Sequence, residues 1–205
     1  MIFRDHSFFS MKKAISVILI STTSFSFISC GNKNPEAPRI ATGGINAVNS
    51  QSASSYFNSA KSLEASGKTK KAINAYEYVA DNYPLSSRAG EARFRQASLL
   101  YKQGDLIDSF DTYQNFIEKH NSSQLYSDAI KRQYEVAIAA AKGTIKHNFM
   151  GLKSKHSAST CEAMLKKCKA NAPYSKMAPN AQFAIGELYQ NRGNAVKSIN
   201  GYKGV

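Results

Sequence analysis

The sequence predicts an all-α fold, a solenoid built from about four stacked pairs of helices. The first observation is the stretch GKTKKAINAYEYVADNYP, residues 67–84, which is followed 37 residues later by GDLIDSFDTYQNFIEKHN. The second is that both stretches place glycine, small, aromatic and apolar residues at the same spacings. Self-similarity at a fixed period is typical of repeat proteins, whose units bury their apolar faces against one another.

Length, hydrophobic content and net charge limit the class of protein. The chain has 205 residues, of which 42% are hydrophobic, and a formal net charge of +13. These numbers suit one globular domain with a tail, and the basic balance favours anionic partners. The lysines and arginines are spread along the chain and are not interleaved with aromatic residues as in nucleic-acid-binding motifs. We therefore expect no nucleic-acid partner.

Residues 1–29 are predicted to be a signal peptide. Lys12 and Lys13 precede a short apolar stretch, residues 14–28, which is interrupted by serine and threonine. Such a stretch is too short and too polar for a membrane span and is typical of a secretory signal. The ten residues before Met11 do not fit this pattern, so we expect Met11 to be the true start.

The end of the signal, Phe-Ile-Ser-Cys-Gly at residues 27–31, resembles a bacterial lipobox, with Phe27 where leucine is usual. The resemblance implies that Cys30 becomes the first mature residue and carries acyl chains such as palmitate. It also implies delivery to the periplasmic face of the outer membrane, because no aspartate follows the cysteine. Several acyl chains on one residue anchor a protein stably. The alternative is an ordinary signal peptide that happens to contain a cysteine.

Residues 30–52 are predicted to be a flexible tether between the lipid anchor and the folded part. They are rich in glycine, asparagine, serine, alanine and proline. Chains of this composition behave as flexible linkers. The folded domain is then expected at residues 53–205. Val205 falls inside the predicted last helix, so the alternatives are a domain truncated at this end or a frayed last helix.

The first repeat unit follows the tetratricopeptide template of alternating aromatic, small, large and turn residues. Its positions are Tyr56, Ala60, Leu63, Gly67, Ala72, Tyr76, Val79 and Pro84. Alanine lets two helices cross closely, glycine accepts the positive φ of a helix end, and proline ends the second helix.

Three further units follow the same template. The second has Ala97, Leu100, Gly104, Ser109, Tyr113 and Phe116, with Asn121 in place of the proline. The third has Cys161, Leu165, Cys168 and Pro173, which lie 52 residues further on and so imply an insertion at residues 143–157. The fourth has Gly186, Tyr189, Gly193, Ser198 and Tyr202. The first helix of the third unit, residues 126–142, is clearly helical, but its register stays open.

Residues 76–120 resemble the N-terminal repeats of the outer-membrane β-barrel assembly lipoprotein family, the D subunit. The shared features are the period, the Tyr83-Pro84 ending and an insertion in the third repeat, and the resemblance covers about residues 52–205. Asn121 departs from the family's second proline, and the family's fifth repeat has no counterpart in this sequence. The resemblance implies a non-enzymatic scaffold that binds the barrel-forming subunit and unfolded outer-membrane proteins.

Two other functions compete with this one. A periplasmic tetratricopeptide adaptor for envelope growth or division normally carries an N-terminal coiled coil, and residues 31–52 show no heptads. A binding module for an anionic cell-wall polymer is favoured weakly by the net charge. No paired carboxylates, phosphate loop or nucleophile–base grouping stands out, so we expect neither an enzyme nor a bound cofactor.

Candidate binding residues follow from one recurring slot on the first helix of each unit. The slot holds Phe57, Phe94 and Phe183, and the basic or aromatic residues near it are Lys61, Tyr101 and Lys102. Repeat proteins bind along the surface made by these first helices. Stacked phenylalanines with a basic rim are predicted to form a groove for an extended peptide. The alternative is that the rings pack between adjacent first helices.

Cys161 and Cys168 are predicted to be small buried residues. They lie seven positions apart on one predicted helix, a rise of about 10.5 Å, which is beyond disulfide reach. A metal site with His147 or His156 has no recognised ligand spacing, so no metal is expected. An intermolecular disulfide is a further alternative in an oxidising compartment.

Overall fold

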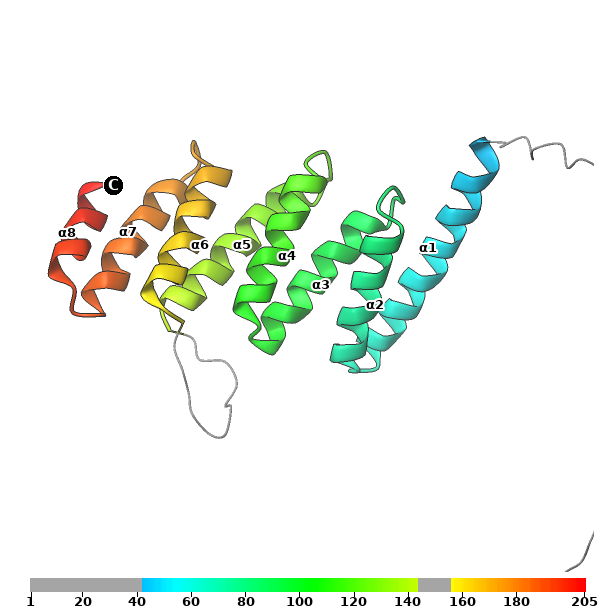
Figure 1. Cartoon of the computed structure of the whole chain (residues 1–205), viewed down its shortest axis with the longest axis horizontal. Coiled ribbons are helices and arrows are strands. Elements are labelled where there is room, and N and C mark those ends of the chain that lie inside the picture. The colour runs from blue at the N-terminus through cyan, green and yellow to red at the C-terminus, as the bar shows by residue number, and fades with distance from the viewer. Residues whose placement is uncertain (1–41, 144–155) are drawn as a thin grey trace, which may run out of the picture. The chain divides into compact units, whose positions relative to one another are not determined.

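A computed structural model describes residues 42–143 and 156–205. The described ranges contain eight helices and no strand, which confirms the predicted all-α repeat fold (Figure 1). The helices are α1 (Thr42–Ala65), α2 (Thr69–Asn82), α3 (Ala89–Gln103), α4 (Leu106–Lys119), α5 (Tyr126–Ala141), α6 (Ala158–Asn171), α7 (Met177–Gln190) and α8 (Ala195–Lys203). The predicted signal peptide, Cys30 and most of the predicted insertion lie outside the described residues.

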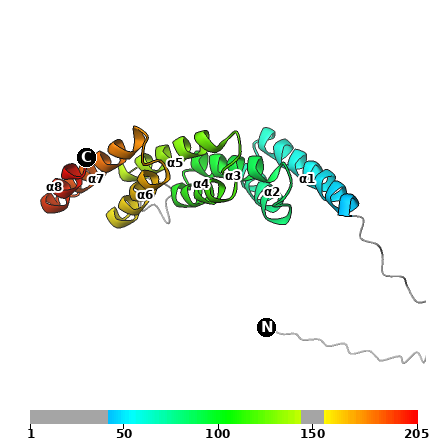
Figure 2. The same ribbon diagram turned by 90° about the horizontal axis from the view of Figure 1, so that it is seen from above.

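Each helix packs on the next one in the chain, so that α1–α2, α3–α4, α5–α6 and α7–α8 form four successive pairs. The first helix of the third pair, α5, also packs on the first helix of the fourth pair, α7. Seen from above, the first helices of the pairs lie along one side of the row and the second helices along the other (Figure 2). Among the described helices, none is long and apolar enough to cross a membrane.

The first helix starts earlier than expected. It begins at Thr42, so residues 42–52 continue α1 rather than belong to the tether predicted at 30–52. Serine, asparagine and glycine are weak helix formers, which is why the composition of this segment suggested a linker. Ala53, the next residue, is already fully buried, so the part of α1 that packs on α2 begins there. Extending an existing helix costs less free energy than starting a new one, so residues 42–52 continue this helix.

Small residues sit where the two helices of a pair cross. In the second pair, Ser109 of α4 donates its hydroxyl hydrogen to the carbonyl oxygen of Ala97 in α3 at 2.8 Å. In the fourth pair, a Cβ atom added to Gly201 would lie 2.6 Å from the backbone nitrogen of Gly186. The predicted small slots are therefore confirmed, and they fix how closely paired helices approach.

The turns also follow the template. Gly67 and Gly104 take φ values of 70° and 80° just after α1 and α3, in the left-handed region that favours glycine. The open register of the third unit is resolved by α5, whose Ala129 and Gln133 are buried like Ala92 and Gln96 of α3. The backbone N–H groups of Ala92 and Ala129 donate to the carbonyl oxygens of Arg88 and Leu125, four residues earlier. Ala129 lies 37 residues after Ala92, and Gln133 lies 37 residues after Gln96.

Candidate protein-binding groove

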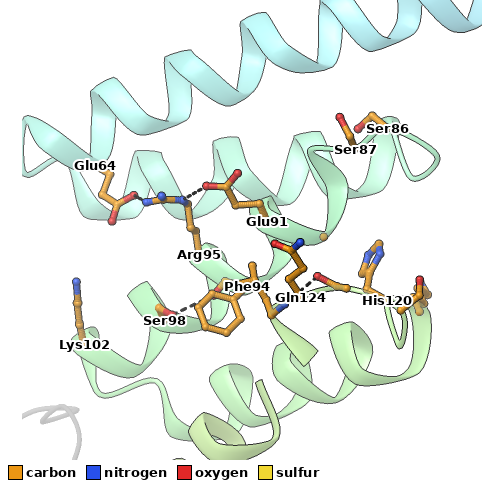
Figure 3. Close-up of a pocket in the computed structure, with 15 residues that line it drawn as sticks. Glu64, Ser86, Ser87, Glu91, Phe94, Arg95, Ser98, Lys102, His120 and Gln124 are labelled. Carbon is orange, nitrogen blue, oxygen red and sulfur yellow. Dashed lines mark hydrogen bonds and ion pairs between the residues drawn. The ribbon is translucent and has the colours of Figure 1, made fainter. Parts of the chain in front are cut away.

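A groove of about 760 Å³ opens between the first two helix pairs and the start of the third. Its lining comes from the end of α1, one face of α3 and the two turns that precede α3 and α5 (Figure 3). The lining residues are Glu64, Ser86, Ser87, Gly90, Glu91, Phe94, Arg95, Ser98, Lys102, Lys119, His120, Ser122, Ser123, Gln124 and Leu125. We call this site the groove.

Helix α3 forms the floor because five of its lining residues share one face. Glu91, Phe94, Arg95, Ser98 and Lys102 are separated by three or four positions, the spacing that aligns side chains along a helix. The helix is fixed by its opposite face, which is buried against α2 and α4. The groove face is therefore held rigidly and presents one aromatic ring among polar and charged groups.

An ion-pair network neutralises the acidic side of the groove. The Arg95 guanidinium lies 2.9 Å from the Glu91 carboxylate and 3.4 Å from that of Glu64. The Tyr76 hydroxyl also donates to Glu64, at 2.5 Å. Burial, followed by this hydrogen bond, raises the pKa of Tyr76 above its ordinary value. Burial by itself lowers the pKa of Arg95, but its hydrogen bond with Glu91 and the nearby negative charges raise the pKa above its ordinary value.

The basic side of the groove has no such neutralisation. Lys102 and Lys119 line it and form no ion pair with any described residue. Glu64 and Glu91 are paired to Arg95, and Glu91 also lies 3.2 Å from the Arg88 guanidinium, so two arginines balance the two carboxylates. The two ammonium groups then give the groove a positive potential. Serine hydroxyls from the two turns complete a lining that suits an anionic or strongly hydrogen-bonding ligand.

The three phenylalanines do not stack on one another, which corrects the predicted apolar floor. Each ring packs instead against a tyrosine of the second helix in its own pair. The pairs and their ring-centroid distances are Phe57–Tyr76 at 5.6 Å, Phe94–Tyr113 at 5.5 Å and Phe183–Tyr202 at 5.1 Å. The alternative, packing between adjacent first helices, holds for Phe57 of α1, which lies under Arg95 of α3 and shares a buried cluster with residues of that helix. Tilted and edge contacts of this kind stabilise aromatic pairs, and here they turn the rings toward the partner helix.

The candidate binding residues therefore separate in space. Phe94 and Lys102 line the groove, and Phe57 lies buried beneath it, with the guanidinium groups of Arg88 and Arg95 at 5.2 and 5.9 Å from its ring centroid. The other three, Lys61, Tyr101 and Phe183, are exposed and do not line this groove. A binding role for any of the six stays a prediction.

Several groove residues were missed in the sequence, above all those in the turns. The turn before α3 contains Ser86 and Ser87, and the turn before α5 contains Ser122 and Ser123. Ser86 and Ser123 are 37 residues apart and make the same backbone hydrogen bond three residues back. The repetition of serine pairs in these turns was the signal that could have identified them.

His120 was also missed as a groove residue. It caps the end of α4, and its ring lies 5.4 Å from that of Phe116. Burial lowers the pKa of His120, and the positive charges of Arg93 and Lys119 lower it further. The imidazole is therefore held neutral and offers the groove a hydrogen-bonding group without a charge.

The predicted burial of Cys161 and Cys168 is confirmed. Burial raises the pKa of both thiols, that of Cys168 to about 12, so both stay protonated and unreactive. Within the described ranges, no three histidine, cysteine, aspartate or glutamate side chains come together in a way that could hold a metal ion. His147 lies outside those ranges.

Comparison with known proteins supports the repeat assignment. The family model of the tetratricopeptide repeat matches residues 54–86 and 91–123, which are the two helix pairs that build most of the groove. These two segments are therefore tetratricopeptide repeats. Because such repeats bind proteins, the role of the chain is that of a protein-binding adaptor. A search of curated proteins found no match to the chain.

Proposed function

We propose that the chain is a lipid-anchored scaffold on the periplasmic face of the outer membrane, where it assists the assembly and insertion of β-barrel proteins. The groove carries the proposal, because most of its lining lies on the two matched repeats and such repeats generally bind proteins. The proposed role is binding without catalysis or a cofactor. The anchor is Cys30, and the lipobox-like residues around it support this location.

The assembly role itself is supported by the resemblance of residues 76–120 to the D-subunit lipoproteins. These residues include the second half of α2 and the whole of α3 and α4, so the resemblance falls on the floor of the groove. The proposed partners are the barrel-forming subunit and unfolded outer-membrane proteins. Lys102 and Lys119 are the residues proposed to attract acidic or carboxylate-bearing segments of these partners.

The direct test is an affinity pull-down of the membrane-extracted protein with Cys30 intact, followed by mass spectrometry. We expect near-stoichiometric recovery of the barrel-forming subunit. The double variant Lys102→Glu/Lys119→Glu should lose it, whereas the matched control Lys70→Glu/Lys71→Glu, with the same charge change on α2, should retain it. Recovery of division or wall-synthesis proteins instead would support the envelope-adaptor alternative and contradict the proposal.

Lys102 and Lys119, which form no ion pair with a described residue, also favour a second candidate, a module that binds an anionic cell-wall polymer. Ionic strength separates the two candidates, because attraction between exposed charges is screened by salt. Binding that disappears between about 50 and 200 mM salt would favour the polymer. Salt-resistant recovery of one protein would favour the scaffold.

A further inference from the structure

Two further clefts lie on the second-helix side of the row, which Figure 2 shows opposite the first helices. One, of about 430 Å³, opens between α2 and α4 and has buried residues of α3 at its base. The other, of about 350 Å³, opens between α4 and α6. Asp111 of α4 lines both, so the two clefts meet at this residue. Neither cleft shares a residue with the groove, so what they bind is a question separate from the proposed function.

The cleft between α2 and α4 is acidic. Its lining includes the carboxylates of Glu77, Asp108 and Asp111, and none of the three forms an ion pair with a described residue. We call it the acidic cleft. Burial, followed by the charge of Asp108, raises the pKa of Asp111 above its ordinary value. The chain has 27 lysines and arginines, yet none of those described compensates these carboxylates.

Two buried polar atoms in the wall of the acidic cleft lack a hydrogen-bond partner. Arg93 is 8% exposed, and its guanidinium pairs with Asp81 and donates to Gln96, but its Nε–H has no acceptor among the described residues. The buried Oδ1 of Asn115 likewise has no donor. A buried polar atom without a partner costs free energy. A peptide backbone offers a carbonyl acceptor and an N–H donor, the two groups that these atoms lack.

The repeat itself does not require these carboxylates. One repeat earlier, the positions of Asp108 and Asp111 are occupied by Lys71 and Asn74, and one repeat later by a threonine and an alanine. Asp108 lies in the first turn of α4, where a negative charge stabilises a helix, but Asp111 lies beyond that turn. The packing of helix pairs therefore does not explain why two aspartates face this cleft.

The cleft between α4 and α6 is apolar. The residues that give it this character are Ile107, Phe110, Ala163 and Met164. We call it the apolar cleft. Lys167 also lines it and lies 3.6 Å from the Glu118 carboxylate. A ligand that crosses α4 would therefore meet free carboxylates on one side of this helix and an apolar surface on the other.

We propose that the two clefts dock a basic segment of a partner protein, in which lysine or arginine lies within a few positions of apolar residues. The basic side chains match the free carboxylates in charge, and the apolar side chains gain burial. A helix is about 10 Å across, and an extended residue spans about 3.3 Å, so three or four residues suffice to cross α4. The groove attracts acidic segments, so the two surfaces would select partners of opposite charge.

Two other occupants fit these clefts less well. Within the described ranges, no three histidine, cysteine, aspartate or glutamate side chains come together in a way that could hold a metal ion. A second copy of the chain carries the same net charge of +13, so two copies repel each other. A peptide also supplies the backbone groups that the buried atoms of Arg93 and Asn115 lack.

A synthetic peptide provides the probe. It joins Lys-Lys-Lys to Leu-Phe-Leu through a Gly-Ser spacer, with blocked ends and a fluorescent label. Titration with the membrane-extracted full-length protein, followed by anisotropy, should give saturable binding. Asp108→Asn/Asp111→Asn should weaken binding about tenfold, because two charge pairs are lost. Glu77→Gln, which leaves the first turn of α4 intact, should weaken it by a smaller factor in the same direction.

Matched variants make the test specific. Asp128→Asn/Glu187→Gln removes the same charge at exposed positions outside both clefts and should bind like the wild type. The groove variant Lys102→Glu should also bind unchanged. Ala163→Gln places a longer polar side chain in the apolar cleft and should weaken binding about threefold or more. A peptide with glutamate in place of the lysines should not bind.

Four results would overturn the proposal. The first two are no binding by the wild type and equal binding by Asp108→Asn/Asp111→Asn and its charge-matched control. The third is self-association of the chain that Asp108→Asn/Asp111→Asn alone abolishes, because the clefts would then hold a second copy. The fourth is binding that appears only after residues 144–155 are replaced by a glycine–serine linker. That segment contains three lysines, and the chain's own insertion would then be the occupant.

Discussion

The ring of Phe94 packs 5.5 Å from the ring of Tyr113, nineteen residues further along the chain and on the other helix of the same pair. The same separation joins Phe57 to Tyr76 and Phe183 to Tyr202. The contact belongs to the helix pair itself, whereas the burial of the phenylalanine depends on what covers the pair. Phe57 and Phe183 therefore make the same contact with a tyrosine but differ in burial, and this difference leads to the first prediction.

Replacing Phe57 by alanine should destabilise the protein far more than replacing Phe183. Phe57 is buried and lies beneath two arginines, so its loss should lower the free energy of unfolding by about 3–5 kcal/mol. Phe183 is half exposed, and its loss should cost about 1–2 kcal/mol. Denaturant unfolding followed by circular dichroism measures both. Equal losses of unfolding free energy would show that the burial of Phe57 beneath Arg88 and Arg95 does not stabilise the protein.

Gly201→Ala should separate α7 from α8. The added Cβ would lie 2.6 and 2.7 Å from the backbone nitrogen and Cα of Gly186, and backbone atoms cannot rotate away. We expect a loss of about 1–3 kcal/mol in the free energy of unfolding, despite the better helix propensity of alanine. The control is Asn200→Ala on the same helix, which should be neutral or slightly stabilising. A stabilised Gly201→Ala variant would contradict this close crossing.

The two buried thiols should not react in the folded protein. Burial raises the pKa of Cys161 and Cys168, so at pH 8 almost no thiolate is available to an aromatic disulfide reagent. In a Cys30→Ser variant, the folded protein should not react with the reagent. After denaturant is added, two thiols per chain should react. The control variant Ala163→Cys, exposed on the same helix, should react at once. Rapid labelling of the folded background protein would place a thiol at the surface.

His120 should make the protein less stable in mild acid. Its pKa is lowered from the ordinary 6.5 in the folded state, first by burial and then by Arg93 and Lys119. The unfolded chain therefore binds the proton first, and the free energy of unfolding falls as the pH drops below about 6.5. His120→Gln should flatten this part of the profile between pH 7 and pH 5, measured by denaturant unfolding at each pH. An unchanged slope would mean that other groups dominate.

Features that depend on local rules could be predicted from the sequence. The glycine that ends a first helix, the small residues at a crossing and the period of the repeat all follow from the chemistry of single positions, as at Gly67 and Ser109. The direction of the Phe57 ring could not be predicted in this way, because it depends on which neighbouring helix offers an aromatic surface. The early start of α1 was missed for a related reason, since packing beyond Ala53 outweighs weak local propensity.

The groove was only partly predictable. Phe94 and Lys102 were identified from the repeat slot, whereas His120 and the serine turns reach the same cavity only because two successive turns lie side by side across α3. Such a juxtaposition depends on the stacking of helix pairs. The ion pair between Glu64 and Arg95 likewise joins residues of different helices, α1 and α3, so it could not be predicted from either helix alone.

The central claim, that a protein partner occupies the groove, is tested most directly by photo-crosslinking in the living cell. A photoreactive phenylalanine analogue is placed at Ser98 in the groove and, as the control, at the exposed Asn74 of α2 outside it. The account predicts a strong adduct from position 98 that contains the barrel-forming subunit or an unfolded outer-membrane protein, and none from position 74. Adducts of equal strength from both positions, or none from position 98, would contradict it.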